Sequence, residues 1–119
     1  MRERQLLGEV EQLVLLALLR LSETRSADPP DVYAVPIRDE LRRHGVELSR
    51  GSIYVTLDRL ERKGYIRSWF ADPIPEPGGK ARRLFRLERQ GLAALRAAQR
   101  LMVRLQSGTL LAPGRGDKP

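Results

Sequence analysis

The chain has 119 residues, enough for one compact domain with a short extension but too few for two full hydrophobic cores. Its 22 Lys and Arg against 15 Asp and Glu give a formal net charge of +7, which favours polyanionic partners, nucleic acid before an anionic membrane. The absence of cysteine and the presence of one histidine exclude disulfides, thiolate metal sites, cysteine nucleophiles and histidine-based metal clusters.

The longest apolar run, residues 13–19, is far shorter than the ~20 residues that a membrane-spanning helix needs. No small-residue cleavage site follows it, so it does not resemble a secretory signal. We therefore expect a cytoplasmic protein without membrane contact.

The first predicted helix, residues 6–21, is apolar around most of its circumference. One face has the helical spacing of a core stripe: Val10, Leu13, Val14, Ala17, Leu18 and Leu21. Leu15, Leu16 and Leu19 add apolar surface on the other side. A helix this apolar is buried by more than its own small domain, so we interpret the second surface as a dimer contact. A central core helix in a monomer is the alternative.

A polar loop containing two prolines is predicted at residues 22–31, before a second helix that ends near His44. Gly45 is a natural C-terminal stop for that helix. Ala34, Ile37 and Leu41 occupy its inward positions. Pro36 leaves the start of the helix open, because proline suits the first turn but removes a hydrogen bond farther inside.

A third helix is predicted at residues 49–62, with Ile53, Leu57 and Leu60 as its buried stripe. Ser49 can cap its first turn. Gly51 lies inside that turn and costs roughly 1 kcal/mol relative to alanine, which makes sense if a bulky partner approaches the backbone. The outer face is hydroxylic and then cationic, which suits a DNA groove and its phosphates. An ordinary solvated helix is the alternative.

Two β-forming segments follow, at residues 65–70 and 82–87. Residues 71–80 between them contain three prolines and two glycines, which predicts a long hairpin loop, or wing. Its cations, Lys80, Arg82 and Arg83, could reach a DNA backbone or a minor groove. No glycine-rich nucleotide-binding pattern occurs.

The last predicted helix spans residues 90–106. Gly91, Leu95, Ala98, Met102 and Leu105 have the seam spacing of a two-stranded coil, so we interpret this helix as a dimerisation arm. Packing against its own domain is the alternative. We expect a DNA-binding domain at residues 1–88, a dimerisation helix at 89–107 and a disordered tail at 108–119.

This order of elements is that of a winged helix-turn-helix, and the residues of four stretches resemble the PadR family of transcriptional regulators. The stretches are residues 7–21, 32–41, 49–66 and 78–95. The resemblance implies a mainly α fold with a small β-hairpin, plus a C-terminal helix that packs with the first helix of a partner subunit. It also implies a repressor-type homodimer that binds double-stranded DNA. Some relatives respond to small molecules at the dimer centre, but the sequence names no effector.

Carried over by position, the resemblance places Gly51, Ser52, Tyr54 and Thr56 at the DNA, with the Tyr54 hydroxyl on a phosphate. The complete set of expected DNA-contacting residues is Ser49, Arg50, Gly51, Ser52, Tyr54, Val55, Thr56, Arg59, Lys80, Arg82 and Arg83. The expected dimer-interface residues are Leu15, Leu16, Leu19, Leu95, Ala98, Met102 and Leu105.

The alternative function is a winged-helix module that binds a protein without sequence-specific DNA contact. We expect no enzymatic activity, cofactor or metal, because no nucleophile–base pair or cluster of metal ligands is present. Acidic residues occur mainly three or four positions from arginines on helix surfaces, for example Asp58 near Arg62.

Overall fold

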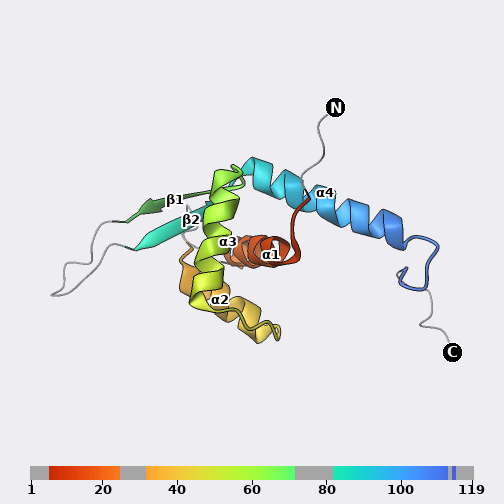
Figure 1. Ribbon diagram of the computed structural model, residues 1–119, viewed down its shortest axis with the longest axis horizontal. Coiled ribbons are helices and arrows are strands. Elements are labelled where there is room, and N and C mark those ends of the chain that lie inside the picture. The colour runs from red at the N-terminus through yellow and green to blue at the C-terminus, as the bar shows by residue number, and fades with distance from the viewer. Residues whose placement is uncertain (1–5, 25–31, 72–81, 113, 115–119) are drawn as a thin grey trace.

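The computed structural model describes residues 6–24, 32–71, 82–112 and 114. These residues form α1 (Glu9–Thr24), α2 (Ala34–Arg43), α3 (Arg50–Arg62), β1 (Ile66–Phe70), β2 (Arg83–Leu87) and α4 (Arg89–Gln106). The first three helices make a body from which the hairpin and α4 extend in opposite directions (Figure 1). A mainly helical chain with one small hairpin was the predicted fold class, and it is confirmed.

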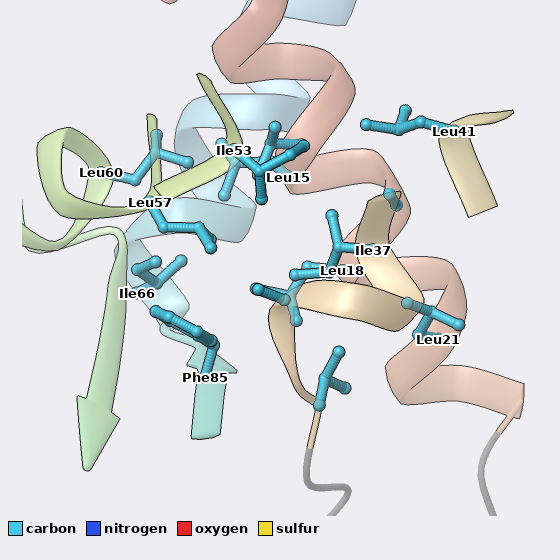
Figure 2. Packing of buried hydrophobic residues seen from close by; sticks show 14 of the residues in the cluster. Leu15, Leu18, Leu21, Ile37, Leu41, Ile53, Leu57, Leu60, Ile66 and Phe85 are labelled. Carbon is cyan, nitrogen blue, oxygen red and sulfur yellow. The ribbon is translucent and has the colours of Figure 1, made fainter. Parts of the chain in front are cut away.

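The core lies where α2, α3 and the hairpin meet α1 (Figure 2). Its fully buried side chains come from all of these elements and include Leu18, Ile37, Leu57 and Phe85. The Phe85 N–H donates to the Val32 carbonyl at 2.8 Å, which joins the start of α2 to the hairpin. Helix α1 contacts α2, α3, β2 and α4, so it is the central helix of the fold.

The second apolar surface of α1 differs from the prediction. Leu15 is completely buried in the chain's own core, whereas Leu16 and Leu19 are half-buried. Helices α2, α3 and α4 and strand β2 all contact α1. More than one face of α1 is therefore buried in the core. The expectation that Leu15 faces a partner subunit is therefore wrong for the side chain itself.

Helix α2 begins and ends as its local sequence requires. Pro36 is its third residue, within the first turn, where a backbone N–H has no partner inside the helix. At the other end Gly45 has a positive φ of 85°, and the N–H groups of Gly45 and Val46 donate to Arg42 and Leu41. This is the Schellman arrangement, and it confirms Gly45 as the stop.

The hairpin pairs β1 with β2 in antiparallel register, Ile66 opposite Leu87 and Phe70 opposite Arg83. Its inner face is apolar near the body, where Ile66 and Phe85 are buried. On the outer face the guanidinium groups of Arg67 and Arg86 lie 5.6 and 5.1 Å from the centre of the Trp69 ring. The predicted loop with Lys80 lies outside the described residues.

The segment after α4 differs in part from the expected disorder. Residues 107–112 form turns, in which the Thr109 hydroxyl donates to the Gln106 carbonyl at 2.6 Å and accepts from the Leu111 N–H at 3.2 Å. The rest of the expected tail, residues 113 and 115–119, lies outside the described residues.

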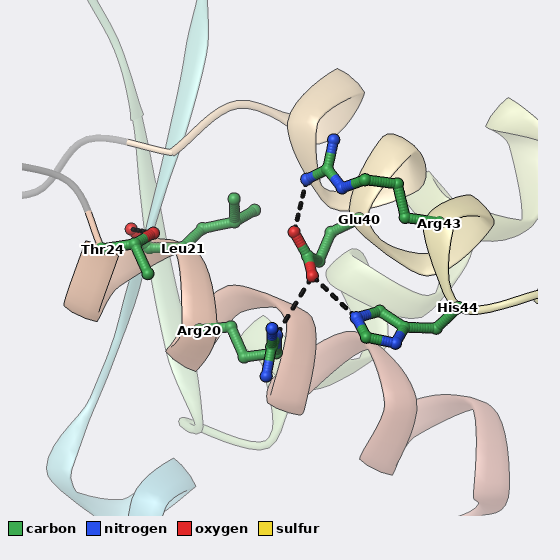
Figure 3. A network of polar contacts seen from close by, with 6 residues as sticks. All are labelled: Arg20, Leu21, Thr24, Glu40, Arg43 and His44. Atoms are coloured by element: carbon green, nitrogen blue, oxygen red, sulfur yellow. Dashed lines mark hydrogen bonds and ion pairs between the residues drawn. The ribbon is translucent and has the colours of Figure 1, made fainter.

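A buried carboxylate joins α1 to α2 (Figure 3). The Glu40 carboxylate accepts hydrogen bonds from the Arg43 guanidinium and from Arg20 Nε, the latter at 3.0 Å. His44 Nε2 lies 3.0 Å from the same carboxylate. Hydrogen bonds from Arg43 and Arg20 lower the pKa of Glu40 to about 2, with a further contribution from His44. His44, the C-cap residue of α2, thus also contacts this carboxylate.

We expect Glu40→Gln to lower the thermal midpoint at neutral pH and to lose this effect in acid. The folded-state pKa of about 2 lies below the ordinary value of 4.5, so the ionised carboxylate stabilises the fold above pH 4.5. That contribution disappears as the pH falls from 4.5 towards 2. Thermal unfolding followed by circular dichroism between pH 7 and pH 2.5 measures the gap between the two proteins.

Glu47→Gln is the matched control, because Glu47 pairs with Arg42 in an exposed ion pair at 3.3 Å. Such a pair contributes little, so the control should track the wild type at every pH. A Glu40→Gln deficit that stayed constant across the pH range would contradict the assignment.

Candidate nucleic-acid interface

The N-terminal end of α3 is exposed and capped by its own sequence. The Ser49 hydroxyl oxygen accepts from the Ser52 N–H at 3.0 Å, which confirms the predicted cap. A Cβ built on Gly51 would find only the Ser49 hydroxyl, 3.9 Å away. No contact among the described residues therefore requires a glycine at this place.

Helix α3 divides into a buried side and an exposed stripe. Ile53, Leu57 and Leu60 are buried as predicted. The exposed stripe, which we call the recognition stripe, consists of Ser52, Val55, Arg59 and Arg62. Arg50 and Gly51 are also exposed, beside its N-terminal end.

Thr56 does not belong to this stripe. It is only 5% exposed, and its hydroxyl donates to the Ser52 carbonyl at 2.8 Å. Thr56 lies three residues after Ile53, and three residues turn an α-helix by about 300°. The two side chains are therefore only about 60° apart around the helix, so the elements that cover Ile53 also cover Thr56. The expected DNA contact by the Thr56 side chain is therefore corrected to a buried, helix-bonded hydroxyl.

Tyr54 and Arg82, which are far apart in the sequence, line one groove of about 740 Å³. The start of α2, helix α3 and the far end of the hairpin line it. The Arg82 guanidinium lies 5.1 Å from the centre of the Tyr33 ring, and Phe70 beside it is 69% exposed. Sequence reasoning missed Tyr33 and Phe70 as members of this surface, although an aromatic residue directly before a helix start was a usable signal.

Arg83 has a different role from Arg82, although the two are adjacent. Its guanidinium is paired with Glu61 at 2.8 Å and with Asp58 at 2.9 Å, and its side chain is only 24% exposed. Asp58 was expected to pair along the helix with Arg62, but it pairs across to the hairpin. Arg83 thus holds β2 against α3, and its predicted role at a phosphate competes with two ion pairs.

Glu61 completes this connection between α3 and the hairpin. It accepts from the Ser68 N–H at 3.0 Å and from the Ser68 hydroxyl at 2.8 Å. Because Ser68 and Arg83 lie on different strands, one carboxylate on α3 holds both strands of the hairpin. The two strands of the hairpin are therefore held at a defined place against α3.

A second buried carboxylate holds the C-terminal end of α3 to α1. Lys63 Nζ donates to Glu11 at 2.7 Å, and the Gly8 N–H donates to the same carboxylate at 2.8 Å. Burial raises the pKa of Glu11, but these hydrogen bonds and the charges of Lys63 and Arg59 together bring that pKa below its usual value. Glu11 is therefore ionised at neutral pH and keeps Lys63 in place.

The predicted dimer residues fall into two groups. Leu95 is buried against its own chain and Ala98 is half-buried, whereas Met102 and Leu105 are exposed on the part of α4 that extends past the body. Leu16, Leu19 and Leu95 line a groove of about 410 Å³ between α1 and α4. Three exposed apolar residues near these were not predicted: Val103, Leu110 and Leu111.

Two classes of site have no support in the part of the chain that the structure describes. No three His, Asp or Glu side chains there are grouped as metal ligands. None of the described helices combines the length and the apolar character needed to cross a membrane.

Comparison with known sequences identifies one family. Residues 26–97 match the Transcriptional regulator PadR-like family. The chain is also 35% identical over 89 residues to Transcriptional regulator Rv3488 of Mycobacterium tuberculosis, which covers 75% of this chain and 79% of that protein.

Two solved structures share the fold. A PadR-like transcription factor from Bacteroides fragilis has a TM-score of 0.66 and 19% identity, over 83% of this chain and 84% of that one. F93 from STIV, described as a winged-helix DNA-binding protein, has a TM-score of 0.61 and 16% identity, over 88% of this chain and 99% of that one. The fold is therefore a winged helix, and the family match spans more than half of the chain. This chain belongs to the PadR-like family of transcriptional regulators.

Proposed function

We propose that this chain represses transcription as a homodimer that binds specific DNA sequences through α3. The observation that carries the proposal is the exposed recognition stripe beside the free N-terminal end of α3. Along that stripe a hydroxyl group is followed by methyl groups and then by guanidinium groups. Side-chain groups of these kinds contact base edges in the major groove. Gly51, which no contact in the described part of the chain explains, leaves room for DNA to approach the backbone.

The groove between α2 and the hairpin supports a phosphate contact beside the major groove. Tyr54 supplies a hydroxyl and Arg82 a guanidinium on the same lining. Contacts of this kind set the position of the protein on DNA without reading its sequence. Lys80, expected next to them, lies outside the described residues.

The far part of α4 supports dimerisation. Met102 and Leu105 are exposed on a helix whose earlier turns are buried against α1. A second copy would cover them, and the two α3 helices would then reach half-sites about one helical turn, ~34 Å, apart. Dimerisation by the same residues also supplies the two-fold symmetry that a palindromic operator needs.

The competing function is a protein-binding module that uses the same cationic face. It predicts a stoichiometric protein partner and no preference among DNA sequences. The experiments below separate the two, because only a DNA-reading protein loses base preference when a side chain of the recognition stripe is shortened.

We expect Arg82→Ala and Ser52→Ala to weaken DNA binding in different ways. Arg82→Ala should weaken binding to all DNA sequences by the same factor. It should also reduce the slope of log affinity against log salt by about 0.9, the value expected for the loss of one phosphate contact. Ser52→Ala should reduce the preference for the operator over random DNA. Fluorescence anisotropy between 50 and 200 mM salt, with an operator selected from a random duplex pool, measures both quantities.

Arg89→Ala is the matched control, since Arg89 is an exposed arginine at the first residue of α4 and lies outside the recognition stripe, the groove of Tyr54 and Arg82, and the residues proposed for dimerisation. It removes the same charge and should leave the salt slope unchanged. Equal affinity of wild type and variants for operator and random DNA would contradict the proposal.

We expect Gly51→Ala to stabilise the chain and to weaken DNA binding. Apart from its chain neighbours and its own helix backbone, the added Cβ meets no atom of the described residues closer than 3.9 Å, and it improves helix propensity by up to ~1 kcal/mol. On DNA the same methyl group occupies the space of close approach and should cost roughly ten-fold in affinity or more. Unfolding and anisotropy titrations of the same preparation measure the two effects; a stabilised variant with undiminished affinity would remove Gly51 from the interface.

We expect the chain to have twice its 13.5 kDa mass in light scattering, and the double variant Met102→Asp, Leu105→Asp to be monomeric. Both side chains are exposed in the single chain, so its helical circular dichroism should persist. Phe70→Asp is the control, because Phe70 is equally exposed but lies on the hairpin. A wild-type monomer at micromolar concentration would contradict the homodimer.

A further inference from the structure

Val55 is the one apolar member of the recognition stripe. It is 55% exposed, with Ser52 one turn before it and Arg59 one turn after it. The burial that fastens α3 to the body comes from Ile53, Leu57 and Leu60. The exposed valine therefore lies at the middle of the proposed reading face, on the side of α3 away from the core.

The fold gains little from a valine here. A β-branched side chain loses rotamer freedom in a helix, so alanine, arginine or lysine would favour α3 more at an exposed position. Exposure also leaves most of the valine methyl surface in water, where it contributes no burial energy. An apolar group of a binding partner that contacted Val55 would bury its methyl groups and so make the valine favourable.

We propose that Val55 contacts the C5-methyl group of a thymine in each half-site and so selects a T·A base pair there. This inference rests on the proposed function, because it needs α3 in a major groove. The thymine methyl is the only apolar group that a base pair presents on its major-groove edge. A valine side chain has no hydrogen-bonding group, so it distinguishes thymine from the other bases by this methyl alone.

Gly51 makes the contact geometrically reasonable. It lies four residues before Val55 and therefore on the same side of α3. A valine side chain is short, so it reaches a base edge only when the helix backbone comes close to the groove floor. The lack of a Cβ at Gly51, with open space around it, allows that close approach on the side where Val55 points.

The test uses operators that the wild-type chain selects from a random duplex pool, resynthesised with deoxyuridine in place of one thymine at a time. Deoxyuridine pairs like thymidine but lacks the C5-methyl group. One position per half-site should weaken wild-type binding about four-fold when substituted, the value of one buried methyl group. Substitution in both half-sites should then weaken binding about sixteen-fold.

Val55→Ala should bind the thymine and deoxyuridine duplexes equally, and a pool selected by this variant should lose the preference at that position. Its folding is not in question, since alanine is the better helix former. Val10→Ala is the matched control, because Val10 is an exposed valine on α1. It should keep the wild-type sensitivity to deoxyuridine.

The outcomes separate this inference from the proposed function. A wild-type chain that selects an operator but is indifferent to deoxyuridine at every position would overturn the Val55 contact alone. Sensitivity that persists unchanged in Val55→Ala would also overturn it. A wild-type chain that enriches no sequence from the pool would overturn both proposals.

Discussion

The hydrogen bonds and ion pair of Glu61 determine how the rest of the surface is arranged. This one carboxylate, on α3, accepts from Ser68 on β1 and from Arg83 on β2. It therefore fixes the hairpin strands against α3 by polar bonds in addition to apolar packing. Without Glu61 the Ser68 N–H would lose its acceptor, and a buried donor left unpaired costs about 1–3 kcal/mol, whereas Arg83 would keep its ion pair with Asp58. The groove that holds Tyr54 and Arg82 together depends on that placement.

The side-chain polar contacts that join helix α3 to its neighbours lie near its C-terminal end, whereas its apolar stripe is buried along the whole helix. Lys63 is bonded to Glu11 of α1, and Glu61 is bonded to the hairpin, both near the last turn. At the N-terminal end the cap is local, from Ser49, and the surrounding residues are exposed. The outer face at the N-terminal end of the helix is thus exposed, while Ile53 on its inner face is packed in the core. Because Gly51 and Val55 lie on this exposed face, their side chains can suit a binding partner with little effect on the stability of the fold.

Helix α4 is the least self-sufficient part of the chain. Its first turns are covered by α1, and Leu95 belongs to the core, but Met102, Val103 and Leu105 face solvent. Exposed apolar groups of this size, continued by Leu110 and Leu111 in the following turns, form a surface suited to association. The proposed homodimerisation would explain in one step why this surface is exposed and why the reading helix would occur twice on a palindromic site.

The sequence alone determined the order and type of the elements, the buried stripe of α3, the Ser49 cap and the Gly45 stop, because these follow from local periodicity and backbone chemistry. It also identified the stripe that carries Val55. Tertiary structure alone decided that Leu15 and Thr56 are buried and that Arg83 pairs with Asp58 and Glu61. Periodicity gives the direction in which a side chain points, but its burial depends on how many neighbouring elements cover that direction. Likewise, the composition gives the number of cationic residues. The strand register determines that Arg83 lies beside carboxylates, whereas the neighbouring Arg82 stays exposed.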